Sequence, residues 1–169
     1  TRDGGEANPT EIVSSPKVAK KLPVHLGVDD IERILRTAAR GARTGNGKRR
    51  SRWLRNRAML EVIYSCGLRA SEVVALDWHD IDEKVGVLRV EHGKGDKQRV
   101  VPIGDDAIAA LAEYRSDWSE PKLERDAVFL NLRGRRLNVR SVGRILDECI
   151  RRGVDRILVV DCPVEVQIE

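Results

Sequence analysis

Hydrophobic residues change their spacing near residue 85, and this change decides the expected fold class. From residue 28 to residue 76 they recur every three or four positions, which is the period of an amphipathic helix. Residues 85–90 and 98–103 are instead β-type runs, and the glycine-containing stretch 93–97 between them is typical of a hairpin turn. Helical spacing returns after residue 104. The pattern predicts an α+β fold that is mostly helical with one small antiparallel sheet.

Glycine and asparagine mark the expected helix ends. Gly41 is expected to end the first helix, so that residues 42–50 form a basic loop, and Gly67 is expected to end the second. Asn138 is expected to cap the last helix through its side chain. The predicted helices cover about residues 28–40, 52–66, 70–76, 105–116 and 139–152.

Basic residues are concentrated in one part of the chain. The formal net charge is only +4, but residues 33–57 contain ten Lys or Arg residues and no acid. Phosphates are natural partners of such a stretch, because each neutralised phosphate releases condensed counterions. A solvated loop without a ligand is the alternative interpretation. Candidate DNA contacts in this stretch, in the hairpin and in the loop at 133–136 are Arg43, Lys48, Arg49, Arg50, Lys97, Arg99, Arg135 and Arg136.

Cysteine usage and hydropathy indicate the compartment. Cys66, Cys149 and Cys162 are odd in number and far apart, without the spacing of a metal site, so we expect reduced thiols in a cytoplasmic protein. No apolar stretch reaches the roughly 18 residues that a membrane span needs. The first residues also lack the pattern of a signal peptide. We therefore expect no membrane partner.

Two cations stand where the backbone can hold them firmly. Arg69 follows the helix-ending Gly67, and its planar guanidinium fork suits a phosphate; Glu72, one helical turn later, can orient it. Lys94 lies between two glycines of the expected hairpin turn and would reach into a DNA groove. Taken singly, each has a simpler explanation. Arg69 would make a helix-end salt bridge, and Lys94 would keep a turn soluble.

The order and spacing of these motifs resemble the Xer/phage-integrase family of tyrosine site-specific recombinases. The resemblance rests on Gly-Leu-Arg-Ala-Ser-Glu at 67–72, Val-Ala-Leu-Asp-Trp-His-Asp-Ile-Asp at 74–82 and Gly-Lys-Gly-Asp-Lys-Gln-Arg-Val-Val-Pro-Ile at 93–103, and it extends over about residues 8–154. It implies the mostly helical catalytic domain of that family. The expected division is a tail or interdomain linker at 1–22, a partial catalytic domain at 23–154 and a strand-like tail of different character at 155–169.

The resemblance implies DNA strand exchange through a covalent phosphotyrosine. In this family a tyrosine attacks a DNA phosphate, two arginines and a histidine stabilise the charged transition state, and a lysine protonates the leaving 5′-oxygen. No metal or nucleotide cofactor is needed. By motif, Arg69 matches the first arginine, Glu72 its acidic companion and Lys94 the lysine. The implied partners are double-stranded DNA and intact recombinase subunits, in a homo- or hetero-oligomer on the DNA.

The second half of the family's active site does not appear in these 169 residues. A His-x-x-Arg motif should follow the helix expected at 139–152, but no histidine of the chain has an arginine three residues later: the three are His25, His79 and His92. Tyr64 and Tyr114 both lie in expected helices and are interpreted as packing residues, not as nucleophiles. The change of character after Gly153 suggests a frameshift or a truncation.

Three functions stay open on these observations. The chain contributes to DNA cleavage and rejoining if another subunit donates a tyrosine. It acts as a DNA-binding remnant if it occupies recombination sites or competes with an intact recombinase. It has no function if it is a decayed gene product. Losing an arginine that stabilises transition-state charge costs about 10²–10³ in rate, so the sequence favours DNA binding without independent catalysis.

Overall fold

The computed structural model describes residues 27–91, 98–118 and 122–153. The linker predicted at 1–22 and the strand-like tail predicted at 155–169 lie outside the described residues, as do Lys94 and Lys97.

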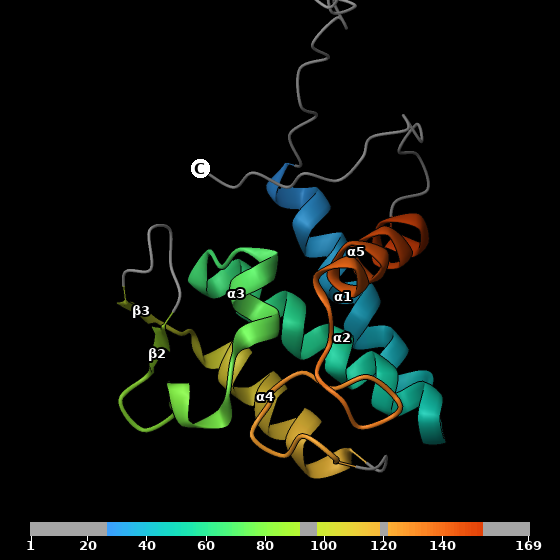
Figure 1. The fold of residues 1–169 in the computed structure, drawn as a ribbon. Coiled ribbons are helices and arrows are strands. Elements are labelled where there is room, and N and C mark those ends of the chain that lie inside the picture. The colour runs from blue at the N-terminus through green and yellow to red at the C-terminus, as the bar shows by residue number, and fades with distance from the viewer. Residues whose placement is uncertain (1–26, 92–97, 119–121, 154–169) are drawn as a thin grey trace, which may run out of the picture.

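The first two helices, α1 (Val28–Thr44) and α2 (Gly47–Cys66), are joined by only two residues and pack against each other (Figure 1). The predictions that the first helix ends at Gly41 and that residues 42–50 form a loop are therefore wrong. Gly41 lies against the indole of Trp53, and a Cβ atom at position 41 would lie 2.4 Å from the Cδ2 atom of that ring. Since side-chain atoms do not approach this closely, Gly41 marks a helix–helix contact and not a helix end.

Helix α2 lies at the centre of the fold. Helix α4 (Asp105–Asp117) packs on it, and α5 (Val139–Gly153) packs on α1 and on the short α3 (Ala70–Ala75). The helices predicted after residue 104 and after residue 138 are confirmed. The cap is confirmed too, because the backbone N–H of Ser141 donates to Oδ1 of Asn138 at 2.9 Å.

Three short antiparallel strands lie side by side in chain order: β1 (Ile81–Asp82), β2 (Val87–Val90) and β3 (Arg99–Pro102). The predicted antiparallel pairing is confirmed, because Val90 pairs with Arg99, while the turn predicted at 93–97 lies outside the described residues. Strand β1 was not predicted, since two residues are too few for an alternating pattern. The mostly helical α+β fold is confirmed.

An aromatic cluster closes the core beneath α4. The Tyr114 ring contacts the rings of Trp78, Trp118 and Phe129, and its hydroxyl accepts a hydrogen bond from the backbone N–H of Leu130 at 3.2 Å. Trp78 belongs to a single 3₁₀ turn, η2 (Trp78–Asp80). Burial raises the pKa of Tyr114 to about 12, so its hydroxyl stays protonated. The prediction that Tyr114 is a packing residue is confirmed.

The same prediction for Tyr64 is wrong. Its side chain lies on the surface, with 54% of the residue exposed. Val62 and Cys66 take the buried side of the last turn of α2, which leaves Tyr64 and Ser65 on the opposite side of that turn. A helix that is buried over most of its length can therefore still expose an aromatic ring at its end.

The two described cysteines, Cys66 and Cys149, are buried and free, as predicted. Burial raises the pKa of the Cys149 thiol to about 12. Cys162 lies outside the described residues. Over the described ranges, no helix combines the length and the apolar character that a membrane crossing requires.

Candidate functional site

Arg69 lies at a sharp turn between two helices. Gly67 ends α2 in the left-handed conformation (φ 59°), as predicted, and its N–H donates to the Ile63 carbonyl at 3.0 Å. Leu68 is 1% exposed and anchors the turn in the core. Arg69 then begins α3 from an extended backbone, and 49% of its side chain is exposed. The turn therefore presents the guanidinium to solvent from a firmly held backbone.

Glu72 binds Arg69 and Arg99 together. Its Oε1 atom accepts from Nη1 of Arg69 at 3.0 Å and from Nη1 of Arg99 at 2.8 Å. Its Oε2 atom accepts from the backbone N–H of Arg69 at 2.9 Å and from Nη2 of Arg99 at 2.8 Å. A carboxylate has about four acceptor positions, so all of them are filled. The Glu72 side chain is only 2% exposed, which means that this network replaces its water.

The network favours the charged forms of Glu72 and Arg99. The hydrogen bonds from Arg99 are the largest influence on Glu72; they and the bonds from Arg69 outweigh burial and lower the pKa of the carboxyl to about 2. The same contact raises the pKa of Arg99. Two guanidinium groups around one carboxylate leave one net positive charge. That charge is exposed at Arg69, which suits it to an anionic ligand.

Arg136 holds the opposite end of α3. Its Nη2 atom donates to Oδ1 of Asp77 at 2.5 Å. Its Nη1 atom donates to the last carbonyls of the helix, at 3.0, 2.7 and 3.1 Å from Val74, Ala75 and Leu76. A helix of six residues has little stability alone, so these bonds and those of Glu72 fix it from both ends. The role of Arg136 as a DNA contact stays a prediction, while its guanidinium caps α3.

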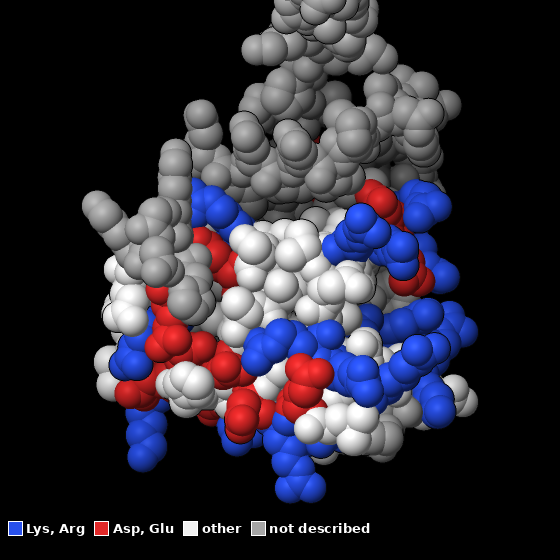
Figure 2. All heavy atoms as spheres, in the orientation of Figure 1, with Lys and Arg blue, Asp and Glu red and all other residues white. Residues whose placement is uncertain are grey.

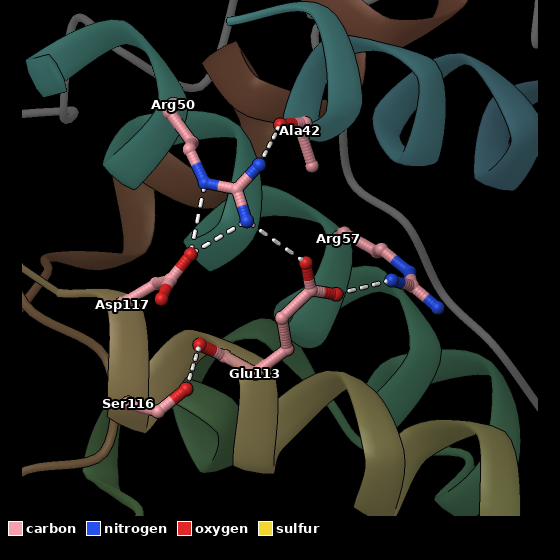
Figure 3. A network of polar contacts seen from close by, with 6 residues as sticks. All are labelled: Ala42, Arg50, Arg57, Glu113, Ser116 and Asp117. Atoms are coloured by element: carbon pink, nitrogen blue, oxygen red, sulfur yellow. Dashed lines mark hydrogen bonds and ion pairs between the residues drawn. The ribbon is translucent and has the colours of Figure 1, made fainter. Parts of the chain in front are cut away.

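Arg50, another predicted DNA contact, joins three helices (Figure 3). Its Nη1 atom donates to the Ala42 carbonyl of α1 at 3.0 Å. Its Nε atom donates to Asp117 of α4 at 2.9 Å, and its Nη2 atom reaches Glu113 at 3.3 Å. Arg57 donates to the other oxygen of Glu113 at 2.7 Å. Much of the charge of Arg50 is therefore neutralised within the fold.

Many cations of the basic stretch 33–57 are paired within the fold, and several are exposed to solvent. Arg55 is 5% exposed and donates to the Leu130 carbonyl at 3.1 Å, and burial lowers its pKa to about 10. Other paired cations are Arg33, Arg36, Arg52 and Arg57, which contact Asp30, Glu32, Glu148 and Glu113. Arg40, Arg43 and Arg49 are exposed and have no side-chain partner among the described residues. Lys48 is exposed as well.

Exposed cations of the predicted site lie near both ends of α2. Arg43, Lys48 and Arg49 lie where α1 meets α2, whereas Arg69 follows the far end of α2 (Figure 1). A helix rises 1.5 Å per residue, so the two ends of this 20-residue helix are about 30 Å apart. Figure 2 shows one face of the molecule, and Lys and Arg side chains gather there over α1, α2 and α5. Arg135 is exposed in the loop before α5.

One cluster of metal-ligand types occurs among the described residues. The side-chain ligand atoms of Asp77, His79 and Asp80 lie within 4.8 Å of one another. Asp77 binds the Arg136 guanidinium, and Asp80 accepts the backbone N–H of Asp77 at 2.9 Å. These carboxylates therefore serve the turn and the α3 cap, and we assign no metal to them.

The pairing of Arg99 with Glu72 was not predicted from the sequence. The two residues are 27 positions apart, and Arg99 was interpreted as a DNA contact along the hairpin. The sequence held only one hint of this pairing: Arg99 belongs to the motif at 93–103, and Arg69 and Glu72 belong to the motif at 67–72. The sequence does not determine whether the Arg99 side chain points toward DNA or toward Glu72.

Comparisons with known proteins agree with the fold described above. The sequence model of the Phage integrase family matches residues 25–158. Tyrosine recombinase XerC of Pelobacter propionicus is 41% identical over 140 residues, which are 83% of this chain and 43% of that protein. The XerA recombinase structure has the same fold, with a TM-score of 0.65 at 24% identity over 83% of this chain and 46% of that one.

A second solved structure is the XerH site-specific recombinase bound to palindromic difH substrate in a post-cleavage complex. It superimposes with a TM-score of 0.59 at 25% identity, over 78% of this chain and 37% of that chain. The chain therefore spans less than half the length of each of these relatives.

Proposed function

Because the chain belongs to the phage integrase family, we propose that it is the DNA-binding part of a tyrosine site-specific recombinase. One observation carries the proposal: Arg69 exposes a guanidinium whose only described partner, Glu72, is already saturated. A charge held in this way suits a backbone phosphate. The match over residues 25–158 supports a recombinase domain at 23–154.

The proposed DNA surface combines Arg69 with exposed cations at the start of α2. Arg43, Lys48 and Arg49 supply the second group, and Arg135 supplies a further exposed cation. The two ends of α2 are about 30 Å apart, which corresponds to about nine base pairs at 3.4 Å each. The XerH relative bound to its difH substrate supports double-stranded DNA as the partner. Lys97 is a further predicted contact.

The proposed catalytic contribution is half of an active site. Arg69 would stabilise charge on the reacting phosphate, Glu72 would hold Arg69, and Lys94 would protonate the leaving 5′-oxygen. Tyr114 cannot act as the nucleophile where it lies, because its hydroxyl is buried and bound to Leu130. We propose that these 169 residues do not cleave DNA alone. Other residues, from the same protein or from recombinase subunits in an oligomer, would supply the rest.

A salt titration tests the DNA surface. We expect the affinity for double-stranded DNA to fall steeply with salt, and Arg49→Gln to reduce the slope of log K against log salt by about 1. Arg36→Gln is the matched control, because Arg36 is exposed in the same basic stretch but pairs with Glu32. Equal effects of the two substitutions would refute the proposed surface.

A nicked recombination-site DNA tests the catalytic part of the proposal. The chain should bind this DNA without forming a covalent protein–DNA band, since no exposed tyrosine is accompanied by a His-x-x-Arg motif. A covalent band that disappears in Tyr64→Phe would instead make the exposed Tyr64 a nucleophile. A band that disappears in Tyr114→Phe would require its buried hydroxyl to move.

A further inference from the structure

Arg99, at the start of β3, donates from both terminal nitrogens to Glu72. We infer that Arg99 is a positioning residue: by saturating Glu72 it keeps the Arg69 guanidinium available for a phosphate. The inference rests on the proposed phosphate-binding role of Arg69. It differs from the prediction that Arg99 itself is a DNA contact.

The two arginines give Glu72 different numbers of side-chain hydrogen bonds. Arg99 gives Glu72 two side-chain donors, at 2.8 Å each, whereas Arg69 gives one side-chain donor at 3.0 Å and its backbone N–H at 2.9 Å. Since the carboxylate accepts about four hydrogen bonds, no position is left for a second side-chain donor from Arg69. The Nε and Nη2 atoms of Arg69 consequently have no partner among the described residues.

Removing Arg99 would open two acceptor positions on a nearly inaccessible carboxylate. The Glu72 side chain is 2% exposed with both arginines in place. A carboxylate that loses two charge-assisted hydrogen bonds favours another charged donor within reach. The nearest guanidinium with unused donors is that of Arg69. It would turn inward to make a forked pair with Glu72, and its outward donors would be lost to a phosphate.

The position of Arg99 fits this role. Its fork is occupied by a carboxylate, and 34% of its side chain is exposed, against 49% for Arg69. Arg99 pairs with Val90 at the base of the hairpin, so the contact also joins the sheet to the turn that carries Arg69. An arginine that binds a phosphate directly would be expected to direct its guanidinium N–H groups toward solvent, whereas those of Arg99 point to Glu72.

A mutant cycle on the 169-residue chain tests the inference through its affinity for a double-stranded DNA oligonucleotide of mixed sequence. Arg69→Gln should weaken binding by about tenfold. Arg99→Gln should weaken it nearly as much, and the double variant should be no weaker than Arg69→Gln alone.

The outcomes separate two failures. If Arg69→Gln leaves the affinity unchanged, the phosphate role of Arg69 is wrong, and the inference falls with it. If Arg69→Gln weakens binding but the effect of Arg99→Gln adds to it in full, only the inference is wrong, and Arg99 binds DNA directly.

Thermal unfolding of each variant identifies any that do not fold. Should Arg99→Gln fail to fold, Arg99→Lys replaces it, because lysine keeps the charge but cannot supply a fork. The lysine variant should show a partial loss of affinity that disappears in the Arg69→Gln background. A loss that persists in that background would overturn the inference.

Discussion

Arg49 and Arg50 are adjacent in sequence, yet we expect their replacement by glutamine to have different consequences. Arg50 makes two half-exposed ion pairs, with Glu113 and Asp117, worth about 0.5 kcal/mol each. Its bond to the Ala42 carbonyl contributes about 1 kcal/mol. Arg50→Gln should therefore lower the free energy of unfolding by about 2 kcal/mol. Arg49 is exposed without a described partner, so Arg49→Gln should change it by less than about 0.5 kcal/mol.

Thermal or urea unfolding measures this difference directly. For a chain of this size, about 2 kcal/mol corresponds to a decrease of about 4–8 °C in Tm. The slope of log K for DNA against log salt is the second measurement. Here Arg49→Gln should reduce the slope more than Arg50→Gln does. The reasoning would be refuted if both variants unfolded at the same temperature. An Arg50→Gln variant of normal stability and reduced salt slope would make Arg50 a phosphate contact, as the sequence predicted.

Two further predictions concern helix packing and pH. Gly41→Ala should destabilise the fold by about 1–3 kcal/mol in urea unfolding, although alanine normally favours a helix, because its Cβ would meet the Trp53 ring at 2.4 Å; a more stable variant would contradict this contact. In the folded state the pKa of Glu72 is lowered from 4.5 to about 2. The ionised carboxylate therefore stabilises the fold by up to about 3 kcal/mol above about pH 4.5, and this stabilisation is lost as the pH falls toward 2. Glu72→Gln should flatten the decline of stability in this acid range, and an unchanged decline would show that other carboxylates cause it.

Local patterns predicted most of the elements. The hairpin of β2 and β3 followed from two β-type runs around a glycine-containing turn, and the cap at Asn138 followed from a polar side chain before a helical period. Gly67 was predicted correctly because a left-handed helix end is a local requirement of the backbone. Gly41 was predicted wrongly because its reason is a ring on another helix, which no local pattern contains.

The sequence by itself determined the family, because the residue types and the spacing around Arg69 and in the hairpin carry the resemblance. Which cations stay available for a ligand was decided only by the tertiary structure. Arg50 and Asp117 are 67 residues apart, and Arg136 and Asp77 are 59 apart, so packing alone brings these charges together. A charge is neutralised by whatever lies within a few ångströms in space. Composition therefore located the basic stretch, and the fold determined which of its charges remain exposed.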